Sequence, residues 1–357
     1  MRTDPTPPAG LGLSCYTENL AGYLSARDPR STDLLARSVR LAVDPATGAF
    51  SHHDRALNNL PGGRRLGYRG APDARTALAG IGAELAARGR VLVVADSGAL
   101  PWLTGSADDH APHLLVVDGR EADGHWHLVD AFTALFSGGG SQEPFAGSVS
   151  DEEFGDLLAF PRGLTPVHRT RNALAFGFPV PPPEHETYQW LAEEPGATDE
   201  RLPGGPWLTG AAALGETARL LLADMASIAD VEDTTGDGSR GVLEDTWAAA
   251  QHHLFRDAHL LASVDAGLSP SERQAVAATT AKWRELPRML RFAANSARRG
   301  RPRPSLVTGA FTALAELEAA ASPLHAAHGY GGPTARPAEA GTALGARLSD
   351  THAPQGG

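Results

Sequence analysis

The amino-acid sequence predicts an α+β protein, in which an antiparallel sheet flanked by helices is followed by an all-helical part. Short apolar runs separated by turn residues lie between residues 91 and 129, as expected for neighbouring strands. Beyond residue 200 the apolar residues instead recur every three or four positions, as on the inner faces of packed helices. The chain has 357 residues, which is enough for two ordinary domains.

The first expected elements are helices. Residues 15–25 carry apolar side chains at helical spacing, and a second helix is predicted over residues 31–42. Residues 43–72 are rich in Gly, Pro and Asn and are predicted to form loops. A third helix is predicted between Asp73, which fits an N-cap, and Gly89, which fits a helix end.

Three short apolar runs follow at residues 91–94, 114–117 and 125–129. Two Asp-Gly pairs lie between the second and third runs and supply residues typical of turns. We therefore expect three adjacent strands, of which the last two form a hairpin. A further strand is predicted over residues 173–178, before a run of three prolines.

The change of pattern along the chain predicts its domain organisation. We expect a flexible N-terminus over residues 1–12 and a mixed domain of helices and strands over residues 13–180. A helical domain is predicted over residues 200–328, because its apolar stripes are those of helices that pack on one another. Residues 329–357 are rich in Gly, Ala and Pro and are predicted to be a disordered tail.

The composition disfavours several classes of function. The formal net charge is 31 − 42 = −11, whereas binding to nucleic acid or to an anionic membrane needs a basic surface. The single cysteine cannot form an intramolecular disulfide, which fits a reducing compartment. Residues 1–12 lack the apolar core of a signal peptide, and no apolar run approaches about 18 residues. We therefore expect a cytoplasmic protein that engages neither nucleic acid nor membrane.

The single cysteine, Cys15, is the first candidate for chemistry. It stands at the start of a predicted helix, where unpaired N–H groups and the helix dipole stabilise a thiolate. Such a thiolate would be nucleophilic at neutral pH. A free cysteine is also often a small buried apolar residue, and its position alone does not separate the two interpretations.

A histidine and an aspartate lie at the ends of the predicted hairpin strands. His113 directly precedes the run at 114–117, and Asp130 closes the run at 125–129. Antiparallel pairing would bring them close, so that the carboxylate fixes the imidazole tautomer and stabilises its protonated form. The alternatives are a histidine at a strand edge and an aspartate that starts a turn. His110 lies nearby but in a loop, so we favour the strand-anchored His113 as the base.

The order of these three residues resembles the papain-like fold, including bacteriocin-processing cysteine peptidases. The sequence is more closely similar to the family of the butirosin biosynthesis protein H N-terminal domain, over about residues 10–165. The helical remainder is similar to the helical domain that often follows this one, especially at Phe255-Arg256-Asp257 and around Trp283. The stretches that carry the first resemblance are Cys15-Tyr16-Thr17-Glu18-Asn19-Leu20, Val91-Leu92-Val93-Val94-Ala95-Asp96, Leu100-Pro101-Trp102, His113-Leu114-Leu115-Val116-Val117-Asp118-Gly119 and Val129-Asp130.

The resemblance implies a covalent acyl-enzyme mechanism. In the namesake reaction a carrier-protein thioester acylates the cysteine, and an amine of an aminoglycoside receives the acyl group. Carried over here, Cys15 would attack the thioester, His113 would deprotonate the thiol and then the acceptor, and Asp130 would orient His113. The expected partners are an acyl donor and a small-molecule amine. The donor is an acyl carrier protein or a small acyl thioester, and its acyl group is expected to be bound to phosphopantetheine. No other cofactor and no metal is expected.

Three further residues are candidates for contact with the substrate. Glu18 and Asn19 follow Cys15 by three and four positions, on the same face of the predicted helix, and Asp96 ends a predicted strand. Each has an alternative as a capping, solvated or turn-starting residue. Papain-like enzymes commonly place a glutamine a few residues before the cysteine to bind the oxyanion, whereas residues 12–14 here are Gly-Leu-Ser. Backbone N–H groups at the helix start, with the Asn19 side chain, are the expected substitutes.

Two other functions rest on the same residues. The triad would act as a peptidase, amidase or thioesterase if water reached the acyl-enzyme, and the missing glutamine also leaves open a catalytically silent binding protein. The helical half would cap the active site or form a homodimer interface. Its basic segment at 298–303 suits an acidic carrier protein but is also typical of a solvated loop.

Overall fold

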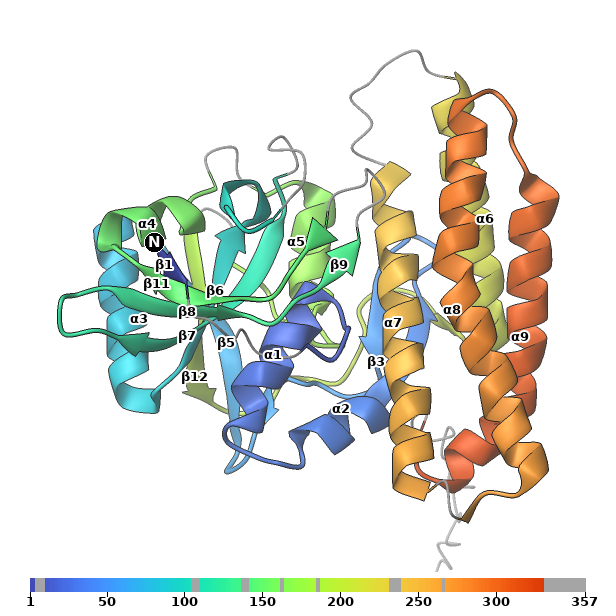
Figure 1. The fold of residues 1–357 in the computed structure, drawn as a ribbon, viewed down its shortest axis with the longest axis horizontal. Coiled ribbons are helices and arrows are strands. Elements are labelled where there is room, and N and C mark those ends of the chain that lie inside the picture. Colours follow the sequence, from blue (N-terminus) through green and yellow to red (C-terminus); the bar gives the residue numbers. More distant parts are fainter. Residues whose placement is uncertain are drawn as a thin grey trace, which may run out of the picture.

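A computed structural model describes residues 1–3, 10–103, 110–135, 141–160, 164–183, 187–230, 239–264 and 267–330 of the chain. An eight-stranded sheet lies on one side of the molecule and four long helices stand side by side on the other (Figure 1). Every neighbouring pair of strands in this sheet is antiparallel, which confirms the predicted α+β class. In spatial order the strands are β1 (Arg2–Thr3), β11 (Phe145–Val149), β8 (Trp126–Asp130), β7 (Pro112–Arg120), β6 (Val91–Asp96), β12 (Tyr188–Pro195), β5 (Arg64–Ala71) and β4 (Asn59–Leu60).

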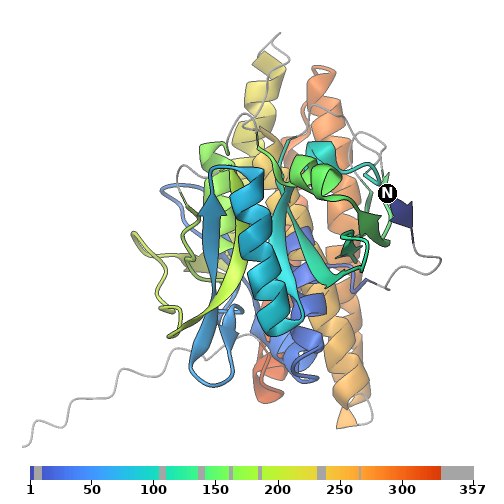
Figure 2. The same ribbon diagram turned by 90° about the vertical axis from the view of Figure 1, so that its left-hand side faces the viewer.

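Helices cover both faces of the large sheet. The outer face packs on α3 (Ala74–Arg88) and α4 (Asp151–Leu158), and Figure 2 shows α3 crossing this face in front of the strands. The inner face packs on α1 (Cys15–Ser25). Side chains of β6 alternate between the two cores, as the pleat of a strand requires. α1 is therefore held between the sheet and the C-terminal helices (Figure 1).

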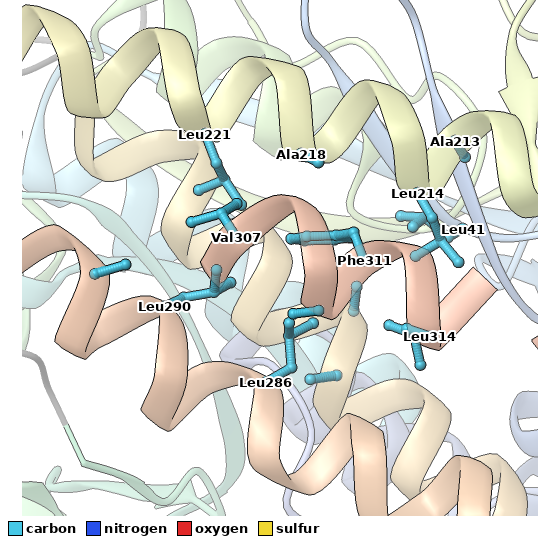
Figure 3. Close-up of a cluster of buried hydrophobic side chains, with 14 of the residues drawn as sticks. Leu41, Ala213, Leu214, Ala218, Leu221, Leu286, Leu290, Val307, Phe311 and Leu314 are labelled. Carbon is cyan, nitrogen blue, oxygen red and sulfur yellow. The ribbon is translucent and has the colours of Figure 1, made fainter. Parts of the chain in front are cut away.

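A second, three-stranded sheet connects the two sides of the molecule. The helix α2 (Ser31–Ser38) leads directly into β2 (Val39–Val43), which pairs with β3 (Phe50–His53) and β13 (Leu208–Thr209). Figure 3 shows Leu41 of β2 beside Leu214, in a core that also holds Phe311. Fully burying each such side chain contributes about 1.5–3 kcal/mol. This packing binds the sheet to the helices α6 (Gly210–Asp230), α7 (Ser239–Val264), α8 (Pro270–Arg298) and α9 (Pro304–Ala327).

The local signals of the sequence are confirmed where they are strongest. The side chain of Asp73 accepts the N–H of Thr76 at the start of α3, and Gly89 ends that helix in the left-handed conformation with φ 75°. The predicted strands after α3 are β6, β7 and β8, which lie next to one another, and β7 and β8 form the predicted hairpin. Among the described residues, none of the helices combines the length and the apolar character that crossing a membrane requires.

Several predicted boundaries are wrong. The strand β12 lies between β6 and β5, so the large sheet reaches residue 195 and does not end at 180. Residues 43–72 contain β3, β4 and β5 where loops were predicted, and the second helix stops at Ser38. Residues 173–178 form no strand, because the helix α5 (Pro166–Leu174) ends there and the chain turns at Gly177, whose φ is 90°. Only the error at β12 concerns pairing with strands distant in the sequence, which local composition does not encode.

The two chain ends also differ from the prediction. Arg2 and Thr3 pair with β11, so they are not a flexible terminus. Tyr330 is buried with 1% of its surface exposed, and its hydroxyl lies 2.7 Å from Nδ1 of His259. The remainder of the predicted flexible N-terminus at 4–9 and of the predicted tail, from residue 331 onward, lies outside the described residues.

Candidate active site

Cys15 is the first residue of α1, as predicted. The preceding Ser14 is the N-cap: its hydroxyl accepts the N–H of Thr17 at 3.4 Å, and its carbonyl accepts the N–H of Glu18 at 2.8 Å. The thiol therefore lies at the positive end of the helix dipole, which favours its thiolate form. Cys15 is partly exposed, so the thiol can be reached from outside.

The hairpin of β7 and β8 brings His113 and Asp130 together. Val116 pairs with Val129, and extending this register by one pair puts Leu115 opposite Asp130. His113 is then the diagonal neighbour of Asp130 on the same face of the sheet. The Nε2 atom of His113 lies 2.8 Å from Oδ2 of Asp130. The Cys15 thiol lies near enough to the imidazole to raise the pKa of His113, through its charge and through a side-chain hydrogen bond. The three predicted residues thus form one continuous chain of contacts.

The charge balance of this chain depends on His113. The Asp130 carboxylate is fully buried and also accepts hydrogen bonds from neutral donors on Asn19, Trp102, Gln142 and the backbone of Phe132. Burial favours the neutral form of each partner, but their mutual attraction outweighs it and lowers the pKa of Asp130. Burial would likewise lower the pKa of His113, yet Asp130 and the Cys15 thiolate raise it to about 10. At neutral pH the geometry therefore favours an imidazolium beside the Asp130 carboxylate.

Asn19 ties the nucleophile helix to the hairpin. Its side chain is 1% exposed, and its Nδ2 donates to the carbonyl of Leu114 at 2.7 Å, to Oδ1 of Asp130 at 2.9 Å and to the carbonyl of Cys15 at 3.2 Å. Its Oδ1 accepts the N–H of Ala131 at 3.1 Å. Both N–H groups are therefore used inside the protein, and the predicted service of Asn19 in an oxyanion hole is wrong. Its predicted contact with a substrate stays a prediction.

Glu18 holds the loop that precedes the nucleophile. Its carboxylate is 2% exposed and accepts the N–H groups of Leu11 at 2.6 Å and Leu13 at 2.8 Å. Burial raises the pKa of Glu18, and these backbone bonds partly oppose the shift. The contacts give Glu18 a role in positioning residues 11–13, and its predicted contact with a substrate stays a prediction.

Asp96 and His110 form a second pair beside the triad. Asp96 ends β6 opposite Pro112, is 2% exposed and accepts the N–H of Gly98 at 3.0 Å. Its Oδ2 lies 2.6 Å from Nδ1 of His110, which is about one-third exposed. The structure thus joins His113, and not His110, to Asp130. Asp96 shapes the neighbouring turn, and its predicted contact with a substrate stays a prediction.

The structure adds residues that sequence reasoning missed. Trp102 donates from Nε1 to Asp130 at 2.9 Å and stacks on Phe145 with ring centroids 3.9 Å apart, and Gln142 donates to the same carboxylate. Trp102 lay in a stretch that carried the family resemblance, which was the available signal. Nothing in the sequence marked Gln142, because its strand β10 (Ser141–Gln142) reaches Asp130 only through pairing with β9 (Ala134–Leu135).

Polar groups without partners lie close to the thiol. The Tyr16 hydroxyl and the Asn172 side-chain amide are buried and form no hydrogen bond with any part of the chain that the structure describes. Tyr68 donates to the carbonyl of Asn172 at 3.1 Å. Burial raises the pKa of Tyr16 and of Tyr68, and the negative charge of the Cys15 thiolate adds to both shifts. These groups are candidates for contact with an acyl group on Cys15.

No model of a known protein family matches the chain, and no curated protein matches it either. The family resemblance of the sequence therefore remains a prediction, and the site is interpreted from its own geometry. Within the described ranges, no group of three or more His, Cys, Asp and Glu side chains is placed to hold a metal ion. The geometry brings a thiol, an imidazole and a carboxylate together as neighbours.

Proposed function

We propose that this protein is a cysteine-dependent acyltransferase, built as a papain-like domain followed by a helical domain. The observation that carries the proposal is the contact chain from Cys15 through His113 to Asp130 at the start of α1. A thiol at a helix N-terminus beside a protonated imidazole is the arrangement in which cysteine is nucleophilic at neutral pH. The donor in this proposal is an acyl thioester, and the acceptor is an amine or another nucleophile.

Each step of the proposed reaction uses a group in this chain. The Cys15 thiolate attacks the thioester carbonyl, and the donor thiol leaves with a proton from His113. The amine then attacks the acyl-enzyme, His113 accepts its proton, and the Cys15 thiolate is released. Asp130 keeps the imidazole oriented throughout. The backbone N–H groups of Cys15 and Tyr16 remain as first-turn donors for the oxyanion, since Ser14 and Glu18 occupy the others.

The proposed donor is an acyl carrier protein whose phosphopantetheine arm bears the acyl group. The segment that joins α8 to α9 carries four exposed arginines, and Arg303 stacks on Phe292, whose side chain is 54% exposed. A basic surface of this kind suits the acidic surface of a carrier protein. Charge reversal at the segment should weaken the apparent affinity for a carrier-bound donor and leave a small thioester unaffected. The exposed arginines are Arg298, Arg299, Arg301 and Arg303.

The first test is the intact mass of the protein after incubation with acyl thioesters, both small and carrier-bound. We expect an acyl adduct on the wild type, none on Cys15→Ala and much slower formation on His113→Ala. Added amines should accelerate loss of the adduct and yield an amide. An adduct that clears equally fast without amine would indicate a hydrolase. An unmodified wild-type protein with every donor, the carrier-bound ones included, would contradict the proposal and favour a binding protein.

A further inference from the structure

The helix α7 belongs to the C-terminal helices, yet it contacts a residue beside Cys15 and a residue beside His113. In Figure 1 it stands between α1 and the other long helices. His252 of α7 lies 3.0 Å from the hydroxyl of Thr17, two residues after the nucleophile. Trp247 of α7 packs edge-on against Phe132, with ring centroids 6.1 Å apart, and Phe132 packs against His113 at 5.5 Å. The helix α7 thus supports the start of α1 through His252, and it supports the imidazole of His113 through Trp247 and Phe132.

The donor and the acceptor of each hydrogen bond between α7 and the start of α1 can be assigned in only one way. Nδ1 of His252 lies 2.6 Å from the carbonyl oxygen of Ala248, so this nitrogen carries a proton. Burial, with the neighbouring His52, lowers the pKa of His252 to about 3, and the ring is neutral. Its Nε2 is therefore an acceptor, and the Thr17 hydroxyl must donate to it.

The same reasoning assigns the donors and acceptors at the N-cap of α1. Having used its only hydrogen, the Thr17 hydroxyl accepts from the hydroxyl of Ser14, 3.0 Å away. The Ser14 oxygen keeps its lone pairs for the N–H of Thr17, which is the N-cap bond that starts α1. A backbone carbonyl in α7 thus fixes the orientation of the Thr17 and Ser14 hydroxyls at the start of α1.

We infer that α7 is a positioning element of the active site, in which His252 locks the Ser14–Thr17 cap beneath Cys15. Trp247 supports His113 through Phe132 in the same way. The inference rests on the proposed function and adds to it a role for the C-terminal helices, which are then required for catalysis and are not an independent module. His252 acts through Thr17 and does not touch the reacting atoms, so it is a positioning residue.

The neighbouring His253 is a matched control. It lies on the same helix, is 4% exposed where His252 is fully buried, and makes the same bond from Nδ1 to a carbonyl four residues earlier, that of Ala249. Its ring stacks on Trp283, with centroids 4.1 Å apart, among the C-terminal helices. His253→Phe therefore perturbs α7 to a similar extent without disturbing the cap of α1.

The test is the rate at which iodoacetamide alkylates Cys15 across pH, a reaction that needs no acyl donor. We expect Thr17→Val and His252→Phe each to slow alkylation at pH 7 about five- to tenfold, the size of effect that loss of a helix cap produces. The pH of half-maximal rate should rise in both variants. Thr17→Ser, which keeps the hydroxyl, and His253→Phe should stay within about twofold of wild type. The double variant should be no slower than either single one, because both break the same chain.

Two results would overturn the inference. One is alkylation of Thr17→Val and His252→Phe with wild-type rate and pH profile, and the other is an equal loss in His253→Phe. Circular dichroism on each variant shows whether the fold is kept, and Thr17→Ser separates loss of the hydroxyl from loss of packing. Acyl transfer can fail while the alkylation pattern holds, so failure of the proposed function is distinguishable from failure of this inference.

Discussion

Among the residues that the structure describes, two histidine–aspartate pairs are buried on both sides, one beside the sheet and one among the C-terminal helices. Nε2 of His113 lies 2.8 Å from Asp130, and Nε2 of His325 lies 3.1 Å from Asp257. Both carboxylates are fully buried. The pairs differ in what neutralises the carboxylate, because Asp257 also accepts a hydrogen bond from the guanidinium of Arg256 at 2.9 Å. The other hydrogen-bond partners that the structure gives Asp130 are all neutral.

This difference gives the same pair of residue types two different charge environments. Arg256 is bonded to Asp257 and also to Glu318, so the C-terminal pair belongs to a buried ion network that joins α7, α8 and α9. Burial would raise the pKa of Asp257, but Arg256, together with His325, lowers it. At Asp130 the imidazole is the counter-charge, and it lies beside a thiol. The charge balance around such a pair, more than the pair itself, indicates an active site.

The largest expected effect comes from removing each carboxylate in turn. Asp130→Asn should slow acylation of Cys15 by about 10²–10⁴-fold, because the amide neither holds the imidazole tautomer nor supports its charge. Asp257→Asn should leave acylation by folded protein within about twofold. It should instead lower the free energy of unfolding by about 3 kcal/mol, since Arg256 stays buried without one of its anions. Acylation kinetics and urea unfolding of both variants measure the contrast.

The comparison would be contradicted if Asp130→Asn lowered only the stability and Asp257→Asn slowed only the acylation. Normal acylation by Asp130→Asn would show that His113 needs no carboxylate. Slow acylation by folded Asp257→Asn would show that the ion network takes part in the chemistry. A circular dichroism spectrum of each variant ensures that only folded protein is compared.

The second effect is on stability as a function of pH, where buried histidines act in opposite directions. Burial, with His52 for His252 and with Arg256 for His253, lowers the pKa of these two histidines to about 3 and about 4. The unfolded chain, with a histidine pKa of about 6.5, binds more protons below that pH. Stability should therefore rise with pH from about 4 to 6.5, and each histidine should cost about 2 kcal/mol at pH 5.

His113 changes the stability with pH in the opposite direction. Its pKa in the folded protein, raised to about 10, lies above the unfolded value. Its contribution to stability is complete below about pH 6.5 and is lost as the pH rises toward 10. The free energy of unfolding, measured with urea from pH 4.5 to 10, should therefore have its maximum near neutral pH. His253→Phe should weaken the pH dependence of the free energy of unfolding below neutral pH alone, and Asp130→Asn should weaken it above neutral pH alone. A change in this free energy that is equal at every pH, in either variant, would contradict these assignments.

The sequence predicted the triad because its three members are each fixed by local structure. Cys15 follows a capping serine, and His113 and Asp130 end two strands joined by a short turn. The diagonal contact also needs the bulge between Val117 and Gly119, which shifts the pairing by one residue and which the turn residues alone do not specify.

The surroundings of the triad were not predictable in this way. Gln142 and His252 reach the site from separate segments, up to 235 residues away in the contact between His252 and Thr17. The same reason hid β12, which enters the middle of the sheet from beyond the predicted domain boundary. Composition and periodicity report which face of an element is apolar, but not which distant element covers it.

The smallest expected effect concerns the two tyrosines near the thiol. The Tyr16 hydroxyl has no partner among the described residues, whereas the Tyr68 hydroxyl donates to Asn172. Tyr16→Phe should therefore raise the free energy of unfolding by up to about 1 kcal/mol, and Tyr68→Phe should lower it by about 1 kcal/mol.

The kinetic effects of the two variants should be reversed. If the acyl group of the donor bonds the Tyr16 hydroxyl, Tyr16→Phe raises the KM for the donor several-fold at a nearly constant kcat, because a uniform binding contact is lost. Tyr68→Phe keeps its KM, since its hydroxyl is already used inside the protein. Unfolding curves and donor titrations of both variants are the measurement. A stabilised Tyr16→Phe with unchanged KM would assign that hydroxyl to the core and place the acyl group elsewhere around Cys15.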